Sequence, residues 1–230
     1  MKKILMAAAA ALFAAVLSPA QATIVGTVDT NPFHSNAAPF GNLQASFFYQ
    51  QVFDDSAFNA PVNINQLTFY NTVTPGGAPN PGAFQIYLGT TTQTVGAIVN
   101  NIPDFGALTS VFDGLLPAVS NGRLDFTLAS SFFYDPLPGT NLLMVVRNFN
   151  FSASPSPLFL DSDTTGLVTS SRHYSGPNGA SGNLKSGLVT GFNDAVAVPE
   201  PSTWAMMIMG VVFASFFALR RKTDVSPTAV

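Results

Sequence analysis

Few side chains in this sequence could act as nucleophiles, bases or acids. The chain has no cysteine, only two histidines (His34 and His173) and twelve acidic residues, of which Glu200 is the only glutamate. Nucleophilic catalysis needs a base beside the nucleophile, and the Gly-x-Ser-x-Gly pattern of serine hydrolases is absent. We therefore expect no catalytic site. A pair of aspartates that meets in the fold could still hydrolyse a glycoside, and this alternative stays open.

One short acidic segment, Asp161-Ser162-Asp163-Thr164-Thr165-Gly166, carries oxygen ligands of the kind that Ca²⁺ prefers. The full twelve-residue calcium loop with its closing glutamate is absent. An Asx-type turn, capped by its own side chains, explains the same pattern. We expect no cofactor, and Asp161 and Asp163 are the candidate ligands if Ca²⁺ binds.

Two aromatic triplets could bind sugars, because aromatic faces stack on pyranose rings. They consist of Phe47, Phe48 and Tyr49, and of Phe132, Phe133 and Tyr134. Aromatic residues at strand positions usually belong to the core, and we expect the same here. Several exposed aromatic side chains on one sheet face or loop rim would instead favour a carbohydrate-binding module.

The N-terminus has the three parts of a secretory signal peptide. Lys2 and Lys3 form a basic start, residues 4–17 are apolar, and Ala20-Gln21-Ala22 has the small-x-small pattern that signal peptidase accepts. Ala20 and Ala22 are thus the predicted recognition residues. We predict removal of residues 1–22, so that the mature chain begins at Thr23. An uncleaved anchor is the alternative.

Near the C-terminus, residues 204–219 form an uncharged apolar run of sixteen residues. As a helix this run would measure roughly 24 Å at about 1.5 Å per residue, slightly less than the ~30 Å hydrocarbon core. Trp204 stands where an interfacial anchor belongs. The basic cluster that follows, which should stay cytoplasmic, consists of Arg220, Arg221 and Lys222. We predict a single transmembrane helix over residues 204–219, with the body outside.

Pro199, Glu200 and Pro201 lie just before this apolar run. The two prolines fix φ and remove backbone donors, which keeps the peptide extended, the form that a protease site binds. A Pro-Glu-Pro motif, a short apolar helix and an arginine cluster, in this order, resemble the PEP-CTERM sorting signal. The resemblance implies cleavage by an exosortase, a membrane-embedded cysteine protease of Gram-negative bacteria that make extracellular polysaccharide. The alternative is a stiff spacer on an ordinary single-pass anchor.

The body between the two ends has the pattern of many short strands. Residues 83–90 and 123–128 alternate between apolar and polar, as half-buried strands do. Residues 142–146 are continuously apolar and predict a central strand covered on both faces. Further candidate strands are residues 45–53, 67–70 and 187–192.

Turn signals separate these strands and indicate the fold class. They occur at residues 74–77, 80–82, 121–122, 138–139 and 176–179. Short strands between Gly/Pro turns predict an all-β antiparallel β-sandwich, with a jelly roll as one form of it. The expected organisation is a signal peptide (1–22), a β-sandwich domain (23–194), a linker with the Pro-Glu-Pro motif (195–203), a transmembrane helix (204–219) and a basic cytoplasmic tail (220–230).

The charge of the body narrows the choice of partners. Residues 23–198 contain four basic and ten acidic residues, a net charge of about −6. Nucleic-acid binding needs a basic face, so we expect no nucleic acid partner. The absence of cysteine excludes disulfides, so that a packed core must stabilise the body.

These features predict an exported protein of the cell surface or the extracellular matrix. It would be held first at the inner membrane by its C-terminal helix, then located in the cell envelope or secreted after processing. The expected partners are signal peptidase, an exosortase and, by the resemblance, exopolysaccharide of a biofilm. A membrane-tethered carbohydrate-binding module and a surface glycan-active enzyme are the alternatives.

Overall fold

The computed structural model describes residues 22–28, 34–41, 48–98, 104–148, 156–163, 170–176, 179–184 and 186–194. The chain divides into two units, residues 1–194 and 195–230, and all described residues belong to the first. No helix among the described residues is long and apolar enough to cross a membrane. The predicted transmembrane helix at 204–219 lies outside the described residues, so it stays a prediction.

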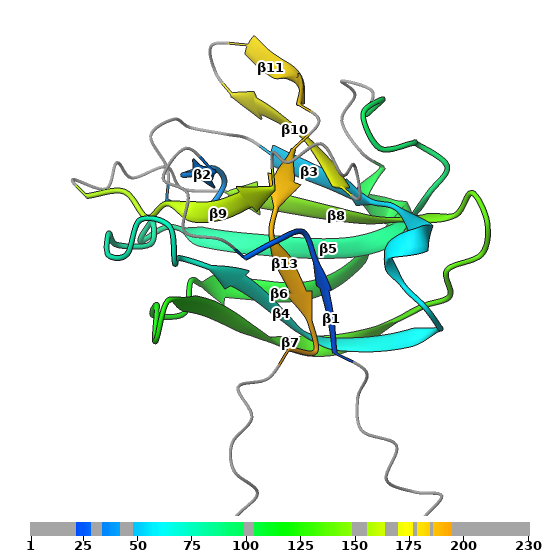
Figure 1. The fold of residues 1–230 in the computed structure, drawn as a ribbon, viewed down its shortest axis with the longest axis horizontal. Helices are drawn as coiled ribbons and strands as arrows, with labels where there is room; N and C mark the ends of the chain where they lie inside the picture. The colour runs from blue at the N-terminus through cyan, green and yellow to red at the C-terminus, as the bar shows by residue number, and fades with distance from the viewer. Residues whose placement is uncertain are drawn as a thin grey trace, which may run out of the picture. The chain divides into compact units, whose positions relative to one another are not determined.

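The described residues form antiparallel β-sheets (Figure 1). The four-stranded sheet has the order β1 (Thr23–Val25), β13 (Thr190–Phe192), β4 (Val62–Tyr70), β7 (Arg123–Tyr134). The six-stranded sheet has the order β11 (Gly179–Leu184), β10 (Ser170–Gly176), β3 (Phe48–Phe53), β8 (Asn141–Asn148), β5 (Ala83–Thr91), β6 (Thr109–Leu115). A three-stranded sheet joins β12 (Gly187–Leu188), β9 (Leu160–Asp163) and β2 (Ser35–Asn36), and two 3₁₀ turns are η1 (Asp55–Ala57) and η2 (Phe105–Ala107).

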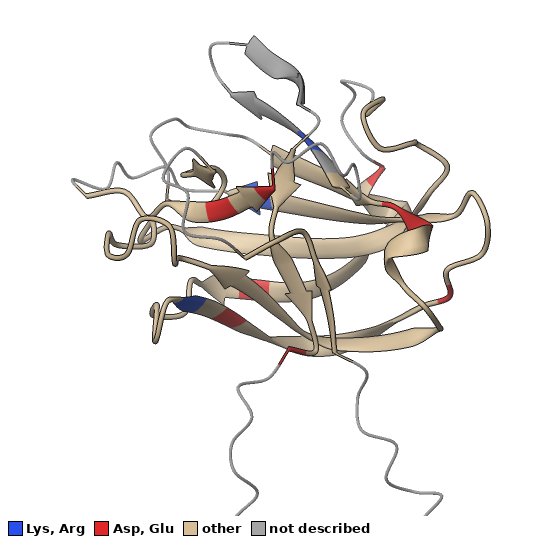
Figure 2. Ribbon diagram, viewed as in Figure 1, with Lys and Arg blue, Asp and Glu red and all other residues tan. Residues whose placement is uncertain are grey.

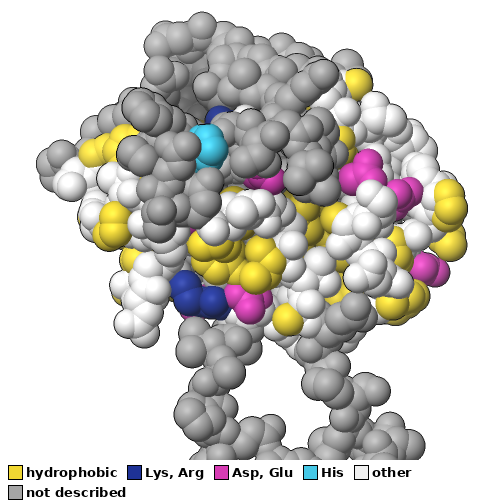
Figure 3. Space-filling model, in the orientation of Figure 1, with side chains coloured by type: hydrophobic (Ala, Val, Ile, Leu, Met, Phe, Trp, Pro, Cys, Tyr) yellow, Lys and Arg dark blue, Asp and Glu magenta, His cyan; other side chains and the backbone are white. Residues whose placement is uncertain are grey.

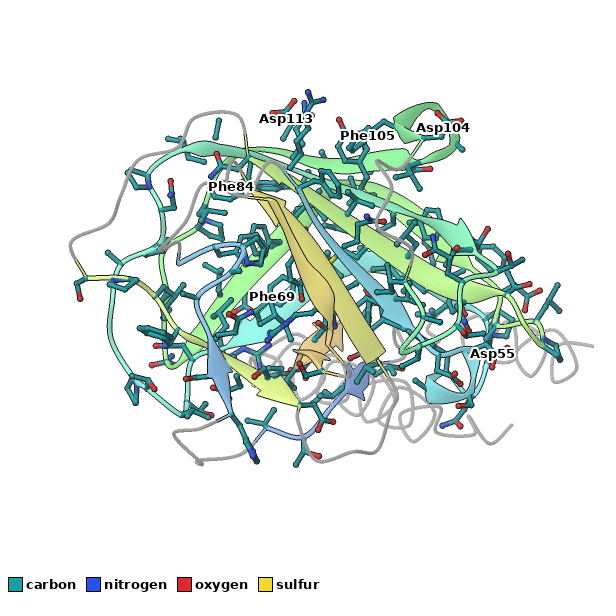
Figure 4. The ribbon with its side chains drawn as sticks, turned by 90° about the horizontal axis from the view of Figure 1, so that it is seen from above. Asp55, Phe69, Phe84, Asp104, Phe105 and Asp113 are labelled. Atoms are coloured by element: carbon teal, nitrogen blue, oxygen red, sulfur yellow. The ribbon has the colours of Figure 1, made fainter. Side chains whose placement is uncertain are left out.

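Phenylalanine side chains fill the space between the two larger sheets. Phe40, from the turn after β2, has its ring centroid 5.0 Å from that of Phe69 in β4, 5.8 Å from Phe84 in β5 and 5.2 Å from Phe126 in β7. All four rings are at most 1% exposed. Phe69 and Phe84 can be located among the core side chains in Figure 4. One aromatic cluster is thus shared by both sheets, an arrangement similar to a β-sandwich.

The alternating pattern of β5 and β7 correctly predicts which side chains face this core. In β5, Phe84, Ile86 and Leu88 are buried, whereas Gln85 and Tyr87 are only partly buried. In β7, Leu124, Phe126 and Leu128 are buried in the same way. Because successive side chains of a strand point to opposite faces, the period-two pattern places the apolar set on one side.

The continuously apolar strand β8 is buried on both faces, as its sequence predicts. Leu142, Met144 and Val146 belong to the core between the sheets. Leu143 and Val145 belong to a second apolar cluster on the opposite face, together with Phe48, Val52 and Ile98. Partly buried side chains from β5, η2 and the neighbouring loops cover this second cluster. A central strand with cover on both sides needs no polar face.

The turn at Asn121-Gly122 has the geometry that its sequence predicts. Both residues have positive φ, 52° and 71°, and they lie between the bridged residues Ser120 and Arg123. Two successive residues with positive φ define the type I′ turn, for which Asn-Gly is the preferred pair. This turn leads directly into β7 and so places Arg123 at the first position of that strand.

The prediction of an all-β antiparallel fold is confirmed, and a jelly roll stays a prediction. The predicted strand 45–53 is described from Phe48 on, because residues 42–47 lie outside the described part. Sequence patterns did not predict β1, β2, β6, β9, β10 or β11. Strand β6 contains Asp113 and Gly114, and β10 and β11 are rich in Ser and Gly, residues that strands disfavour. These strands form because neighbouring strands offer hydrogen bonds to them.

We predict that truncation of Phe40 strongly destabilises the fold. Phe40→Ala should lower the free energy of unfolding by about 3–5 kcal/mol, because it leaves a cavity where three other rings meet. Phe133→Ala serves as the control, since Phe133 is 65% exposed, and should change stability by no more than about 0.5 kcal/mol. Urea denaturation measures both. Equal effects of the two substitutions would contradict the assignment of the core.

Candidate sorting site and the end of the folded body

The structure describes only one of the residues predicted to take part in export and sorting. Ala22 is exposed and lies one residue before β1. The others lie outside the described residues: Ala20, Pro199, Glu200, Pro201, Trp204, Arg220, Arg221 and Lys222. What the structure gives instead is the place where the folded body ends and the chain leads into the sorting segment.

The two ends of the body lie next to each other in the four-stranded sheet. Strand β1 pairs with β13 in antiparallel fashion, and Thr23 is the partner of Phe192. Figure 1 shows β1 and β13 side by side. Because the strands are antiparallel, the chain enters β1 and leaves β13 at the same end of the sheet. The predicted cleavage site before Thr23 and the exit towards the sorting segment are therefore neighbours.

Asn193 holds the chain against β4 immediately after β13. Its backbone N–H donates to the carbonyl of Gln66 at 3.0 Å, and its φ of 54° is one that asparagine tolerates better than most residues. Its side-chain Oδ1 accepts hydrogen bonds from the backbone N–H groups of Asn65 at 2.9 Å and Gln66 at 3.3 Å. Its Nδ2 donates to the carbonyl of Asn63 at 3.0 Å. The register of β4 shifts in this region, and such an irregularity leaves backbone groups that Asn193 satisfies.

Asp194 is fixed by Arg123, from the first position of β7. Nη1 of Arg123 lies 2.8 Å from Oδ2 of Asp194, and Nη2 donates to the backbone carbonyl of the same residue. Nη2 also lies 3.1 Å from Oδ1 of Asp125. Burial by itself would lower the pKa of Arg123. The hydrogen bonds and ion pairs with Asp125 and Asp194 have the larger effect, and the pKa of Arg123 is raised. On the face drawn in Figure 3, basic and acidic side chains lie side by side next to hydrophobic ones.

Tyr70 makes a further contact with Asp194, and Gly191 leaves room for it. The hydroxyl of Tyr70 donates to Oδ2 of Asp194 at 2.5 Å, and the guanidinium carbon of Arg123 lies 5.5 Å from the centroid of the Tyr70 ring. A Cβ at Gly191 would come within 2.8 Å of the Tyr70 hydroxyl and 2.9 Å of the Asp194 Cβ, so only glycine leaves room for this contact. The hydroxyl of Thr68 donates to Oδ1 of Asp125 at 2.6 Å and accepts from Nη2 of Arg123 at 3.1 Å. We name the residues that hold the end of the body the C-terminal cluster: Thr68, Tyr70, Arg123, Asp125, Gly191, Asn193 and Asp194.

The acidic segment that contains the candidate calcium ligands begins as a strand. Asp161 and Asp163 belong to β9, and Thr164–Gly166 lies outside the described residues. The carboxylate of Asp161 accepts hydrogen bonds from the backbone N–H groups of Thr72 and Val73, both at 3.0 Å, and from the Thr72 hydroxyl at 2.5 Å. These bonds give Asp161 a structural role in holding the loop after β4. Among the described residues, no three His, Cys, Asp or Glu side chains are grouped as a metal site would need.

The aromatic triplets lie mainly in the core. Tyr49 and Tyr134 are fully buried, Phe48 is 7% exposed, and Phe132 is partly buried against the core. Phe133 is the one strongly exposed aromatic side chain of the triplets among the described residues, and Phe47 lies outside them. The described part of the body therefore offers no row of exposed aromatic side chains that could stack on successive sugar rings.

Charged residues are sparse and scattered over the described part of the ribbon (Figure 2). Asp55 lies far from Asp104 and Asp113 (Figure 4). The structure brings Asp125 and Asp194 together, but the guanidinium of Arg123 bonds both carboxylates.

A second buried polar group lies between β3, β10 and β12. The side chain of Gln51 donates to the carbonyl of Leu188 at 2.8 Å and accepts from its N–H at 3.0 Å. Tyr49 donates to Gln51, and burial raises the pKa of Tyr49, an effect that Arg172 partly offsets. Arg172 is 8% exposed, and within the described part its Nε and Nη1 have no hydrogen-bond partner. The backbone of His173 belongs to β10, and the backbone carbonyl of His34 accepts a hydrogen bond from the N–H of Ser162 at 2.7 Å.

A comparison with protein families decides the nature of the segment that follows the C-terminal cluster. The family described as "PEP-CTERM protein-sorting motif" matches residues 197–222. The chain carries a PEP-CTERM sorting motif. The match contains the predicted motif residues Pro199, Glu200 and Pro201, and it ends at Lys222 of the basic cluster. A comparison with curated proteins finds no match to the chain.

The sorting motif supports an exported protein that is directed to the cell surface and processed by an exosortase. Its match begins three residues after Asp194, the last residue of the described body. The motif itself was predictable because it combines rare residues in a fixed order. The C-terminal cluster was not, because its members come from three separated parts of the sequence, residues 68–70, 123–125 and 191–194. Asn193-Asp194 directly after a strand was the one local signal, since both residues favour turns.

We predict that Arg123 contributes more to stability than an arginine outside the C-terminal cluster. Arg123→Met should lower the free energy of unfolding by about 1–3 kcal/mol, because it leaves the partly buried carboxylates of Asp125 and Asp194 without their positively charged partner. Arg147→Met is the matched control. Arg147 is exposed and stacks on Phe105 at 5.4 Å, a contact worth about 0.5–1 kcal/mol. Urea denaturation would refute the prediction if Arg147→Met cost as much.

We also predict a loss of stability at alkaline pH. Burial, the hydrogen bond to Asp194 and the charge of Asp194 raise the pKa of Tyr70, and burial with nearby aspartates raises the pKa of Tyr134 from 10.0 to about 12. Above the unfolded pKa the unfolded chain loses these protons first, so stability is full below about pH 10 and falls as pH rises towards 12.

Tyr70→Phe tests the part of this loss that belongs to the C-terminal cluster. At neutral pH the variant should be about 1 kcal/mol less stable, because it lacks the hydrogen bond to Asp194. Between about pH 10 and 12 its stability should fall less steeply than that of the unsubstituted protein, because one titrating group is gone. Denaturation at a series of pH values measures the slopes. Identical slopes would show that Tyr70 does not titrate with a raised pKa.

Proposed function

We propose that this protein is a non-enzymatic extracellular protein whose β-rich body is delivered to the outside and then released from its sorting segment. The signal peptide starts export, the apolar run at 204–219 holds the precursor at the inner membrane, and an exosortase cuts near Pro199, Glu200 and Pro201. The observation that carries this proposal is the match of residues 197–222 to the PEP-CTERM sorting motif.

The position of the motif relative to the body supports this proposal. The described body ends at Asp194, and the match begins at residue 197. A protease can bind only chain that is free to extend, and residues after Asp194 belong to a separate unit. The prolines of the motif favour an extended backbone. The folded body therefore does not need the sorting segment for its own sheet, and it would stay folded after the cut.

The adjacent ends of the body fit a precursor attached to the membrane at both ends. The entry into β1 and the exit from β13 lie at the same end of one sheet. Two membrane segments, the signal peptide and the run at 204–219, could thus stay in one membrane while the sheet forms outside. Signal peptidase would act on the first and an exosortase on the second.

After release, we propose that the body associates with exopolysaccharide of the surrounding matrix. The support is the resemblance of the C-terminus to sorting signals of bacteria that make such polymers, together with a body that carries a net charge of about −6 and few basic residues. A negative, weakly charged body avoids nonspecific binding to nucleic acid in the matrix.

Substitution of the motif tests the central step. In the native host, replacing Pro199, Glu200 and Pro201 together by alanine should leave a protein that retains residues 204–230, because the protease no longer recognises its site. Intact-mass analysis of the purified protein measures this, and the unsubstituted protein should begin at Thr23 and end near the motif. Pro136→Ala with Pro138→Ala is the control, since both prolines belong to the body, and it should be trimmed normally. Normal trimming of the motif variant would refute the proposal.

A further inference from the structure

The C-terminal cluster fixes the point at which the chain leaves the fold. Arg123, in β7, binds both the carboxylate and the backbone carbonyl of Asp194. Tyr70, in β4, donates a hydrogen bond to the same carboxylate. Asn193 makes four hydrogen bonds to the backbone of residues 63–66. Such contacts go beyond what strand pairing needs, because β13 ends at Phe192. They hold two further residues of the chain on the sheet.

The distance from this fixed point to the motif is short. Pro199 is the fifth residue after Asp194, and five residues of fully extended chain span at most about 17 Å. A protease that binds the motif must therefore reach a stretch of chain that lies within about 17 Å of the folded body. Little free chain therefore remains between the body and the bound motif.

We propose that the C-terminal cluster is a positioning device for the sorting reaction: it sets the reach of the Pro-Glu-Pro motif, with residues 195–198 as the spacer. Arg123 and Asn193 act as positioning residues, through the end of the chain that they hold. The folded body lies directly against the protease during the cut, and the cut falls after Asp194, so the released body keeps the whole cluster. This inference rests on the proposed function, in which an exosortase cuts near the motif.

The spacer length provides the first arm of the test, with the full chain expressed in the native host. Deletion of Ala195 and Val196 leaves Pro199 only three residues after Asp194, a reach of about 10 Å, and keeps the matched segment 197–222 intact. We expect the rate of trimming, followed by pulse labelling and intact mass, to fall at least tenfold. Insertion of Gly-Ser-Gly after Ala195 should leave the rate unchanged, because a longer spacer still reaches the protease.

Rescue of the deletion provides the second arm. Arg123→Met with Asn193→Gly removes the contacts that Arg123 and the Asn193 side chain make, and it leaves the hydrogen bonds of Asp194 to Tyr70 and Thr68; glycine keeps the positive φ at position 193. In the deletion background this double substitution weakens the hold on Asn193 and Asp194, which can then detach as two extra spacer residues, about 7 Å of reach. We expect trimming to recover at least threefold. Arg147→Met in the same background is the control and should give no recovery.

Each arm can overturn the inference. Trimming of the deletion variant at the normal rate would show that the body does not limit the reach of the motif. Failure of the double substitution to restore trimming, with the body still resistant to added protease, would show that the C-terminal cluster does not hold the spacer. If the double variant does not fold, Asn193→Gly with Asp194→Ala in the deletion background takes its place, with the same expectation, because it removes the two side chains through which the end of the body is held. Failure of the proposed function is distinguishable, because alanine substitution of the motif would then leave trimming unchanged.

Discussion

The pairing of the first described strand with the last one is the constraint on which the four-stranded sheet depends. Strand β13 lies between β1 and β4, so the residues just before the sorting segment occupy an inner position of the sheet. Phe192 of this strand also reaches the other sheet, where its ring centroid lies 5.0 Å from that of Phe53. Because β1 pairs with β13, the sheet can be completed only after both ends of the body are present on the same side of the membrane.

Aromatic burial supplies the cohesion that disulfides provide in many exported domains. The chain has no cysteine but has twenty-one phenylalanines. Phe40, Phe69, Phe84 and Phe126 meet between the larger sheets, and Phe58 joins Phe192 and Tyr134 in a second group of rings. Large rings bury much apolar area per residue, and tilted or edge-on contacts add to this stabilisation. The fold thus depends on packing rather than on covalent links.

Three of the charged residues of the body meet at its end. Arg123 is held by Asp125 and Asp194 where the chain leaves the sheet, and Tyr70 shares the carboxylate of Asp194. These groups come together in space although they are far apart in the sequence. The contacts fix the last two residues of the described body, and the match to the sorting motif begins three residues further along the chain.

By itself, the sequence determined the sorting motif and the character of the body. The order Pro-Glu-Pro, apolar run and basic cluster is local information, and so are the alternating pattern of β5 and β7 and the Asn121-Gly122 turn. Tertiary structure alone decided that β6, β10 and β11 are strands, because their Ser, Gly and Asp residues carry no hydrophobic pattern and depend on hydrogen bonds from neighbouring strands. It also decided that Asp161 serves as a structural carboxylate and that Arg123 meets Asp194. Those contacts join residues far apart in the chain, and no local pattern of residue types encodes such a meeting.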